Sequence, residues 1–383
     1  MTDPIIIAGR RTPIATLGRA FQSHRADELA ASVLRAVRDD ADHVAGQTLS
    51  VGDVILGNCT GPGGNIARVS ALAAGLDTSV PAGTVDRQCG SGLAAIIDAA
   101  AAIRAGDHRV RLAGGVESAS TAPVRSINEA PYDRAPFTPM GWPDPDMPRA
   151  AENLAKLDGI SRARQDAYAA RSHDRAERAR DSGLFDAELV TSAALDHDDA
   201  IGVARPLLHR FTPLFAGGTV TAGTSTRVSD GAAVVAVAPA GTAPGLAIRS
   251  TRITGCDPAF PGIGAVSAIR AVLDDIGAAL SDVAAIEIVE AFAAQSLAVL
   301  NRLGLDDDDP RVCAEGGALA LGHPWGASGA VVAVRLFSRL VRANKPSGTL
   351  GVAAASIGGG MGVAIAVEST GIVALHTQSV RSL

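Results

Sequence analysis

A cysteine in a glycine-rich turn, set between an extended segment and an apolar helix, constrains this chain more than any other feature. Residues 80–85 favour a strand, Cys89 is followed by Gly90-Ser91-Gly92, and residues 93–105 are almost all Ala, Ile and Leu. The sequence predicts a strand, a tight turn and a helix, with the thiol near the helix N-terminus, where the helix dipole favours a thiolate. The glycines would let a substrate approach backbone N–H groups that stabilise an oxyanion. The alternative is a buried cysteine before a buried helix.

Two more glycine-rich stretches lie near the other end of the chain. Residues 316–329 place His323 in a turn before the apolar run 330–341, which is predicted to be a helix. Residues 355–362, which include Ser356, follow a predicted strand with a glycine loop. The order of turn, helix, strand and paired glycines repeats that of the Cys89 segment, which indicates a weak internal repeat.

Strand and helix patterns alternate through most of the chain. Strands are expected at residues 4–9, 51–57, 110–113, 284–289 and 350–355, and helices at 26–37, 65–74, 266–276 and 292–303. This alternation predicts an α/β fold with a largely parallel sheet covered on both faces. Residues 121–148 are rich in proline and are expected to be ordered but irregular. Residues 149–180 are predicted to form an arginine-rich helix, most of whose arginines are expected to face solvent, as is the acidic turn at 306–309. The alternative is that one or two of these arginines reach the phosphates of a large anionic cofactor.

Composition narrows the class of protein. The chain has 383 residues, of which 47% are hydrophobic but only 3% aromatic, so the core should consist of Ala, Val, Leu and Ile. The net charge of −6 argues against a nucleic-acid partner. No apolar run is long enough for a signal peptide or a membrane span. The cysteines match no zinc or disulfide pattern, which fits a reducing cytoplasm, and no metal site, P-loop or dinucleotide-binding motif is expected.

In chain order, these stretches and several others resemble the thiolase family over nearly the whole chain. The other matching stretches are Arg11-Thr12-Pro13, residues 114–118, 151–153, 160–166, 218–223, 229–233 and 290–295. The resemblance implies two similar βαβαβαββ halves, packed as a five-layered αβαβα sandwich, with an inserted loop domain that binds coenzyme A. The implied boundaries are 1–116 with 228–247 for the N-terminal half, 117–227 for the loop domain and 248–383 for the C-terminal half. A tail after Glu368 is expected to be poorly ordered.

The resemblance also assigns site residues. Cys89 would take an acyl group from an acyl-CoA, and His323 would deprotonate it. The backbone N–H groups of Cys89 and Gly360 would form the oxyanion hole, and Ser356 occupies a third catalytic position. Residues implied to contact coenzyme A or line the acyl pocket are Met147, Phe215, Ala222, Thr226 and Phe292.

Two positions depart from the family pattern. Val289 stands where the family has an asparagine that holds a catalytic water, and valine cannot hydrogen-bond that water. Ser356 stands where the family has a second cysteine that moves the proton on the α-carbon of the second substrate. A hydroxyl is a far poorer base than a thiol at neutral pH. Acyl transfer to Cys89 should therefore survive, while carbon–carbon bond chemistry is in doubt.

Three functions remain open at this point. The first is thiolysis of a 3-ketoacyl-CoA in fatty acid metabolism, or condensation of acyl-CoAs, with coenzyme A as substrate or product and no permanently bound cofactor. The second is an acyl-CoA hydrolase, or a transferase to a nucleophile other than carbon. The third is a non-catalytic subunit that binds acyl-CoA, although an intact pair of Cys89 and His323 argues against it. The resemblance implies a homodimer or homotetramer.

Overall fold

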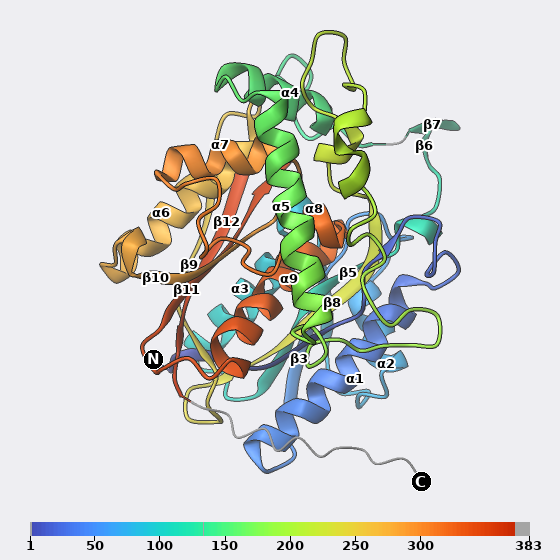
Figure 1. The fold of residues 1–383 in the computed structure, drawn as a ribbon. Helices are drawn as coiled ribbons and strands as arrows, with labels where there is room; N and C mark the ends of the chain where they lie inside the picture. The colour runs from blue at the N-terminus through green and yellow to red at the C-terminus, as the bar shows by residue number, and fades with distance from the viewer. Residues whose placement is uncertain (1, 133, 372–383) are drawn as a thin grey trace.

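The computed structural model describes residues 2–132 and 134–371 and has an α/β fold, as the sequence predicts (Figure 1). Ten strands join in one hydrogen-bonded array with the order β10-β11-β12-β9-β1-β8-β5-β3-β4, and β2 pairs with β8. The strands are β1 (Pro4–Arg11), β2 (Ala15–Thr16), β3 (Val51–Gly57), β4 (Ala82–Val85), β5 (Val110–Glu117), β8 (Ser229–Pro239), β9 (Leu246–Gly255), β10 (Val283–Ile288), β11 (Leu350–Ile357) and β12 (Met361–Ser369). A separate hairpin consists of β6 (Arg125–Ile127) and β7 (Ala130–Tyr132).

The array is mixed rather than largely parallel. β3 pairs in parallel with β4 and β5, and β10 with β11, but β1, β8, β9 and β12 form antiparallel pairs. Among the strands of the described residues, those of the two halves pair only where Ile5 and Ile6 of β1 face Ala247 and Leu246 of β9. The array is therefore two sheets that touch at one corner, which leaves room for a layer of helices between them.

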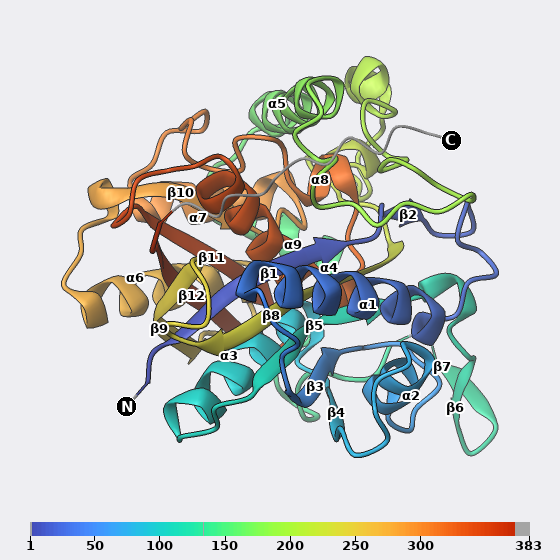
Figure 2. The ribbon, with the colours of Figure 1, turned by 90° about the horizontal axis from the view of Figure 1, so that it is seen from below.

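The helices are α1 (Ala26–Ala45), α2 (Ile66–Ala73), α3 (Ser91–Arg104), α4 (Met147–Leu157), α5 (Arg162–Asp181), α6 (Gly264–Ile276), α7 (Ala293–Leu303), α8 (Ala318–Leu321) and α9 (Trp325–Phe337). α1 packs on β1, β5 and β8 of the N-terminal half, and α6 packs on β9, β11 and β12 of the C-terminal half. α3 and α9 contact each other and strands of both sheets (Figure 2). This arrangement has the helix–sheet–helix–sheet–helix order expected of a five-layered sandwich.

The two halves repeat one order of elements, with one difference. The N-terminal half runs β1, α1, β3, α2, β4, α3, β5, β8, and the C-terminal half runs β9, α6, β10, α7, α9, β11, β12. The strand that would correspond to β4 is reduced to one bridge between Ile286 and Val312. The two halves therefore share the predicted βαβαβαββ plan, with this strand shortened in the C-terminal half.

Glycines allow the central helices to touch. A Cβ on Gly92 of α3 would lie 2.5 Å from the backbone nitrogen of Ala330 in α9, and a Cβ on Gly329 would lie 2.6 Å from that of Leu93. No side chain fits at such distances, so only glycine lets the first turns of α3 and α9 come into backbone contact. The turns that precede these helices are thereby brought together.

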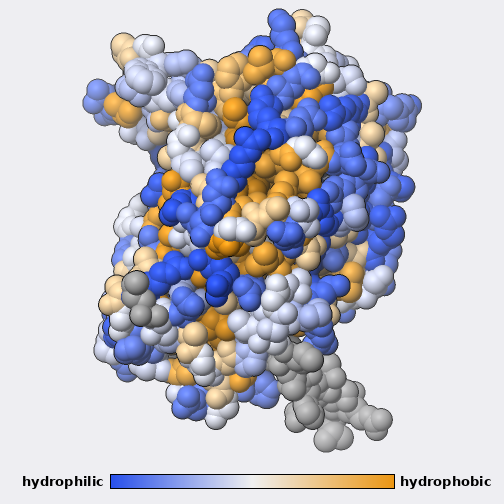
Figure 3. Space-filling model, turned by 90° about the vertical axis from the view of Figure 1, so that its left-hand side faces the viewer, coloured by the Kyte–Doolittle hydropathy of each residue, from blue (hydrophilic) through white to orange (hydrophobic). Residues whose placement is uncertain are grey.

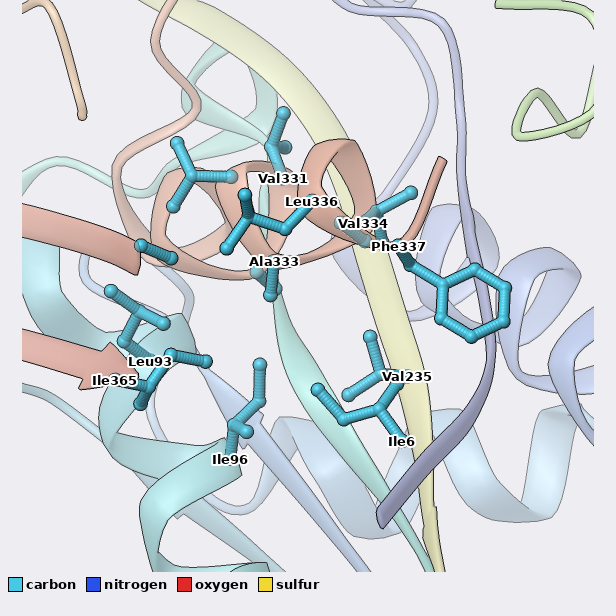
Figure 4. Close-up of a cluster of buried hydrophobic side chains, with 14 of the residues drawn as sticks. Ile6, Leu93, Ile96, Val235, Val331, Ala333, Val334, Leu336, Phe337 and Ile365 are labelled. Carbon is cyan, nitrogen blue, oxygen red and sulfur yellow. The ribbon is translucent and has the colours of Figure 1, made fainter. Parts of the chain in front are cut away.

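Beyond this contact the central layer is apolar. Leu93 and Ile96 of α3, Val331 of α9 and Ile365 of β12 belong to one cluster of buried hydrophobic side chains (Figure 4). The core is built from Ala, Val, Leu and Ile, as composition predicts. The outer surface on the side of α6 is mixed, with hydrophobic residues gathered near its centre among hydrophilic ones (Figure 3). Among the described residues, no helix has both the length and the apolar character to cross a membrane.

Several element boundaries differ from those predicted. The predicted helix at 330–341 begins at Trp325, and the one at 149–180 is two helices, because Gly159 has a φ of +62° and Ser161 caps the second helix. Residues 121–148 are largely irregular but contain the β6–β7 hairpin. β12 continues to Ser369, and most of the expected tail lies outside the described residues.

The expectation that the arginine-rich helix and the acidic turn face solvent is wrong for several residues. Arg164 of α5 forms an ion pair with Asp307 at 2.5 Å, and Arg171 donates to the carbonyl oxygen of the same aspartate at 2.7 Å. Arg175 donates to other carbonyl oxygens of the turn at 306–309. These contacts fasten α5 to the C-terminal half.

A buried ion network joins three parts of the chain. Arg11 at the end of β1 binds Glu188 and Asp198, both at 2.7 Å, and all three side chains are fully buried. Glu188 also pairs with Arg335 of α9 and accepts a hydrogen bond from Ser338. Paired charges of this kind are costly to leave incomplete, so Glu188 is a critical link between the N-terminal strand, the middle segment and α9.

Candidate active site

The structure brings Cys89 and His323 together. Cys89 lies in a short turn at the start of α3, and His323 lies between α8 and α9. The Nε2 atom of His323 is 3.3 Å from Sγ of Cys89, although 234 residues separate the two in sequence. The backbone contact of α3 with α9 makes this approach possible, because both residues lie just before those helices.

The hydrogen bonds of His323 define which nitrogen faces the thiol. Its Nδ1 atom is 2.6 Å from Oγ of Ser328, and this Oγ lies 3.0 Å from the carbonyl oxygen of Pro324. A carbonyl can only accept, so the hydroxyl proton of Ser328 points to Pro324, and its oxygen accepts the Nδ1–H of His323. The unprotonated Nε2 then faces Cys89 and can accept the thiol proton.

Burial keeps both members of the pair neutral. It raises the pKa of the Cys89 thiol to about 12, and the nearby carboxylates of Glu117 and Asp86 act in the same direction. Burial also lowers the pKa of His323 to about 4. The sequence led us to expect that the helix N-terminus favours a thiolate, but desolvation outweighs this effect. The resting site is a thiol and a neutral imidazole, ready for general-base catalysis.

The backbone N–H of Gly358 lies within reach of the Cys89 thiol. The backbone N–H groups of Cys89 and Gly358 both favour the thiolate form of Cys89, against the effect of burial. Gly360 belongs to the turn between β11 and β12, where its carbonyl oxygen accepts a hydrogen bond from the backbone N–H of Cys256 at 2.8 Å. The sequence interpretation passed over Gly358, although it is the first residue after β11.

The hydroxyl of Ser356 is already occupied. It donates to the carbonyl oxygen of Gly262 at 2.7 Å and accepts the backbone N–H of Ala265 at 3.1 Å. These bonds tie β11 to the start of α6. In this structure the hydroxyl proton of Ser356 is therefore used in a backbone hydrogen bond.

Val289 lies in an apolar setting beside the histidine's partner. It follows β10, is buried, and lines the same small cavity as Ser328 and Leu321. Its side chain offers methyl groups there and no hydrogen bond. The structure thus places Val289, which departs from the family pattern, beside the cavity that Ser328 lines, and Ser328 is the residue that orients His323.

Glu117, at the end of β5, holds the surrounding loops. Its buried carboxylate accepts the backbone N–H groups of Cys59 at 3.1 Å, Thr60 at 3.0 Å and Gly326 at 3.0 Å. It therefore links the loop after β3 to the first turn of α9. Burial raises its pKa. Glu117 falls within residues 114–118, which carry the family resemblance, but no local pattern in the sequence indicates this positioning role.

Some of the residues expected to contact coenzyme A lie close to His323. The backbone N–H of Thr226 donates to the carbonyl oxygen of Ala291, and the neighbouring residue Ser225 bridges to Phe292. The backbone N–H of His323 donates to the next carbonyl along this segment, that of residue 227. The hydroxyl of Thr226 donates to the backbone carbonyl oxygen of Ala318 at 2.5 Å, so its proton is used in a hydrogen bond within the protein.

The other expected contact residues lie in the middle segment. Met147 is the first residue of α4 and is half-buried. Arg149, two residues later, has its guanidinium 3.5 Å from the centroid of the Phe215 ring, so it covers one face of that ring. Ala222 is exposed at the surface. Phe215 thus packs against α4, the helix that begins at Met147.

Comparison with known proteins places the chain in a family. Residues 4–241 match the family model "Thiolase, N-terminal domain", and residues 243–369 match "Thiolase, C-terminal domain". The chain is 38% identical to the 3-oxoadipyl-CoA/3-oxo-5,6-dehydrosuberyl-CoA thiolase of Escherichia coli (strain K12), over 96% of this chain and 100% of that protein.

Two solved structures share the fold. The acetyl-CoA acetyltransferase of Bacillus anthracis superposes with a TM-score of 0.86 and 34% identity, covering 96% of this chain and 99% of that one. The Acat5 thiolase from Ascaris suum, in complex with coenzyme A, gives a TM-score of 0.85 and 31% identity, covering 96% and 100%. With its two domains matched in tandem and its full length aligned, this chain belongs to the thiolase family of acyl-CoA acyltransferases.

Proposed function

We propose that the enzyme transfers acyl groups through a thioester on Cys89. Nε2 of His323 takes the thiol proton as Sγ attacks the acyl-CoA carbonyl carbon. The N–H groups of Cys89 and Gly358 stabilise the resulting oxyanion. The carbon–sulfur bond to coenzyme A then breaks, and the proton held by His323 goes to the departing CoA thiolate. The single observation that carries this proposal is the 3.3 Å contact between the partly buried thiol of Cys89 and an oriented, neutral imidazole.

The second half-reaction would regenerate Cys89. In thiolysis of a 3-ketoacyl-CoA, as in fatty acid metabolism, Cys89 would attack the 3-keto carbon instead, the bond between C2 and C3 would break, and C2 of the departing acetyl-CoA would gain a proton. A CoA thiol would then take the acyl group from Cys89. In condensation, the carbanion of a second acyl-CoA would take the acyl group. Both need a second acid–base group, and the hydroxyl of Ser356 is engaged by two backbone groups. Val289 offers no hydrogen bond to a water. We therefore expect weak carbon–carbon chemistry.

A second candidate function follows from the same observation. Transfer of the acyl group to water or to an amine needs no carbanion, so Ser356 need not act as a base. His323 would deprotonate the incoming nucleophile in that case. This acyl-CoA hydrolase or transferase shares the Cys89 thioester and differs in its product. A non-catalytic acyl-CoA-binding subunit is the third candidate, which the paired thiol and imidazole make less favourable.

We propose that coenzyme A binds as a substrate against the loop domain, residues 117–227. The N-terminal half would then comprise residues 1–116 with 228–247, and the C-terminal half residues 248–383. The contacts of coenzyme A would be Met147, Phe215, Ala222, Thr226 and Phe292. The CoA complex of the Ascaris suum thiolase supports this choice of ligand. We propose that neither a metal nor a permanently bound cofactor takes part.

We also propose that the protein works as a homodimer or homotetramer in the cytoplasm. β4 ends the sheet order, and its four residues are all partly exposed, so a second copy could extend the sheet along this edge. Val69 and Leu72 of the adjacent helix α2 are also exposed. The free thiols of Cys59, Cys89, Cys256 and Cys313 fit a reducing compartment.

Mass spectrometry tests the proposed thioester directly. Protein mixed with acetyl-CoA should gain one acetyl mass on Cys89, and the Cys89→Ala variant should gain none. Equal labelling of both proteins would refute the assignment. Product assays then separate the candidates, because acetoacetyl-CoA indicates condensation, whereas free CoA with acetate indicates hydrolysis. Absence of both acylation and turnover would leave the binding subunit.

A further inference from the structure

Phe137 lies directly on the glycine that faces the catalytic thiol. A Cβ built on Gly358 would lie 2.5 Å from Cε2 and 2.8 Å from Cδ2 of the Phe137 ring. A Cβ on Gly359 would lie 3.3 Å from Cβ of the same residue. The ring is therefore in contact with the backbone at Gly358, and a side chain at that position would displace it.

The loop that carries Phe137 is fastened at its base. Arg134 forms an ion pair with Asp144 at 2.9 Å, and its guanidinium lies 4.6 Å from the centroid of the Phe137 ring. The other carboxylate oxygen of Asp144 accepts the backbone N–H of Phe137 at 3.2 Å. By contrast, Met140 and Trp142 at the tip of the loop are largely exposed. The loop thus presents one aromatic ring to the site and its remaining apolar side chains to the surface.

The position of the ring limits the space for an acyl group. An oxyanion bound to the Gly358 N–H would lie about 3 Å from that nitrogen, and its carbonyl carbon about 1 Å further. Each additional carbon adds roughly 1.5 Å. An acyl chain that extends from this oxyanion across Gly358 would therefore meet the ring of Phe137 within its first few carbons.

From this placement we infer that Phe137 is a specificity-determining residue, which restricts the acyl group on Cys89 to a short chain. The inference rests on the proposed function, since it assigns a size limit to the same thioester. The limit would be set by the Phe137 side chain, which Arg134 and Asp144 hold over Gly358.

The test compares acylation rates of Cys89 by acetyl-, butanoyl-, hexanoyl- and octanoyl-CoA, followed by intact-protein mass spectrometry. We expect Phe137→Ala to raise the ratio of octanoyl to acetyl rates by about tenfold or more. Phe137→Leu, which keeps an apolar side chain in the loop, should give a smaller rise in the same direction. Met140→Ala removes an exposed side chain from the same loop and should leave the ratio unchanged.

The outcomes separate this inference from the proposed function. An unchanged ratio in both Phe137 variants, with Cys89 still acylated, would overturn the inference alone. If acetyl-CoA fails to acylate the wild type, the proposed function fails. In that event, the rates at which N-alkyl iodoacetamides of increasing chain length alkylate Cys89 measure the same limit on chain length. A faster alkylation by long-chain reagents alone in Phe137→Ala supports the inference, and unchanged alkylation rates contradict it.

Discussion

Ser328 accepts the Nδ1–H of His323 at 2.6 Å and thereby fixes the imidazole tautomer that faces Cys89. The hydroxyl can act only as an acceptor here, since its own proton is directed to the carbonyl oxygen of Pro324. A small buried side chain in the first turn of α9 thus decides which ring nitrogen is available as a base.

Removal of this hydroxyl should impair catalysis more than folding. Ser328→Ala should slow acylation of Cys89 by about tenfold or more, because both imidazole tautomers become populated and the ring loses a fixed orientation. Ser70→Ala is the matched control, since Ser70 is also a buried helical serine that donates to the carbonyl four residues earlier. Equal effects of the two variants on acylation, measured by stopped-flow and mass spectrometry, would contradict this role.

The pH dependence of Cys89 should reflect a neutral pair. The pKa of the thiol is raised to about 12 and that of His323 is lowered to about 4, so neither group changes charge between pH 6 and pH 9. The acylation rate should be nearly flat across this range and fall as the pH approaches 4, where His323 gains a proton. An inflection near pH 8.5, the ordinary value for cysteine, would mean that a free thiolate is the nucleophile.

The two departures from the family pattern predict slow thiolysis of acetoacetyl-CoA. Ser356→Cys should raise this rate, and Ser356→Cys with Val289→Asn should raise it further, while acylation of Cys89 changes little. A proton-transfer group contributes about 10²- to 10⁴-fold and an oxyanion donor about 10²- to 10³-fold, without simple multiplication. Thiolysis followed at the absorbance of the 3-ketoacyl-CoA checks the series.

Two results would change this interpretation. Fast thiolysis by the unaltered protein would show that another group, such as His323, moves the second proton. A loss of activity on the natural substrate when Ser356 and Val289 are replaced would indicate a substrate that carries its own base or a carboxylate that it loses.

The buried ion network of Arg11, Glu188 and Arg335 should make a large contribution to the free energy of unfolding. Glu188→Gln would leave Arg11 and Arg335 without a shared counter-charge, which should cost about 3–5 kcal/mol of the free energy of unfolding. Asp181→Asn breaks an exposed ion pair with Arg180 and should change it by less than about 1 kcal/mol. Urea unfolding of both variants provides the comparison, and similar values for the two would show that burial of the network contributes little.

The sequence by itself determined the parts that depend on local pattern. The alternation of strands and helices gave the α/β class, and the glycine turns around Cys89 and His323 indicated where the catalytic pair lies. Such turns can be predicted from the sequence because a strand, a tight turn and a helix N-terminus each require particular residues within a few positions. The two departures at Val289 and Ser356 were visible for the same reason.

Only the tertiary structure decided how those residues behave. The neutral state of Cys89 follows from burial, which opposes the effect of the helix N-terminus. The approach of the Gly358 N–H to the Cys89 thiol depends on how the turn after β11 meets the start of α3. The engaged hydroxyl of Ser356 and the ring of Phe137 over Gly358 are contacts across 94 and 221 residues of sequence, respectively. Desolvation and long-range contacts have no local sequence signal, because each is set by which distant segments the fold brings together.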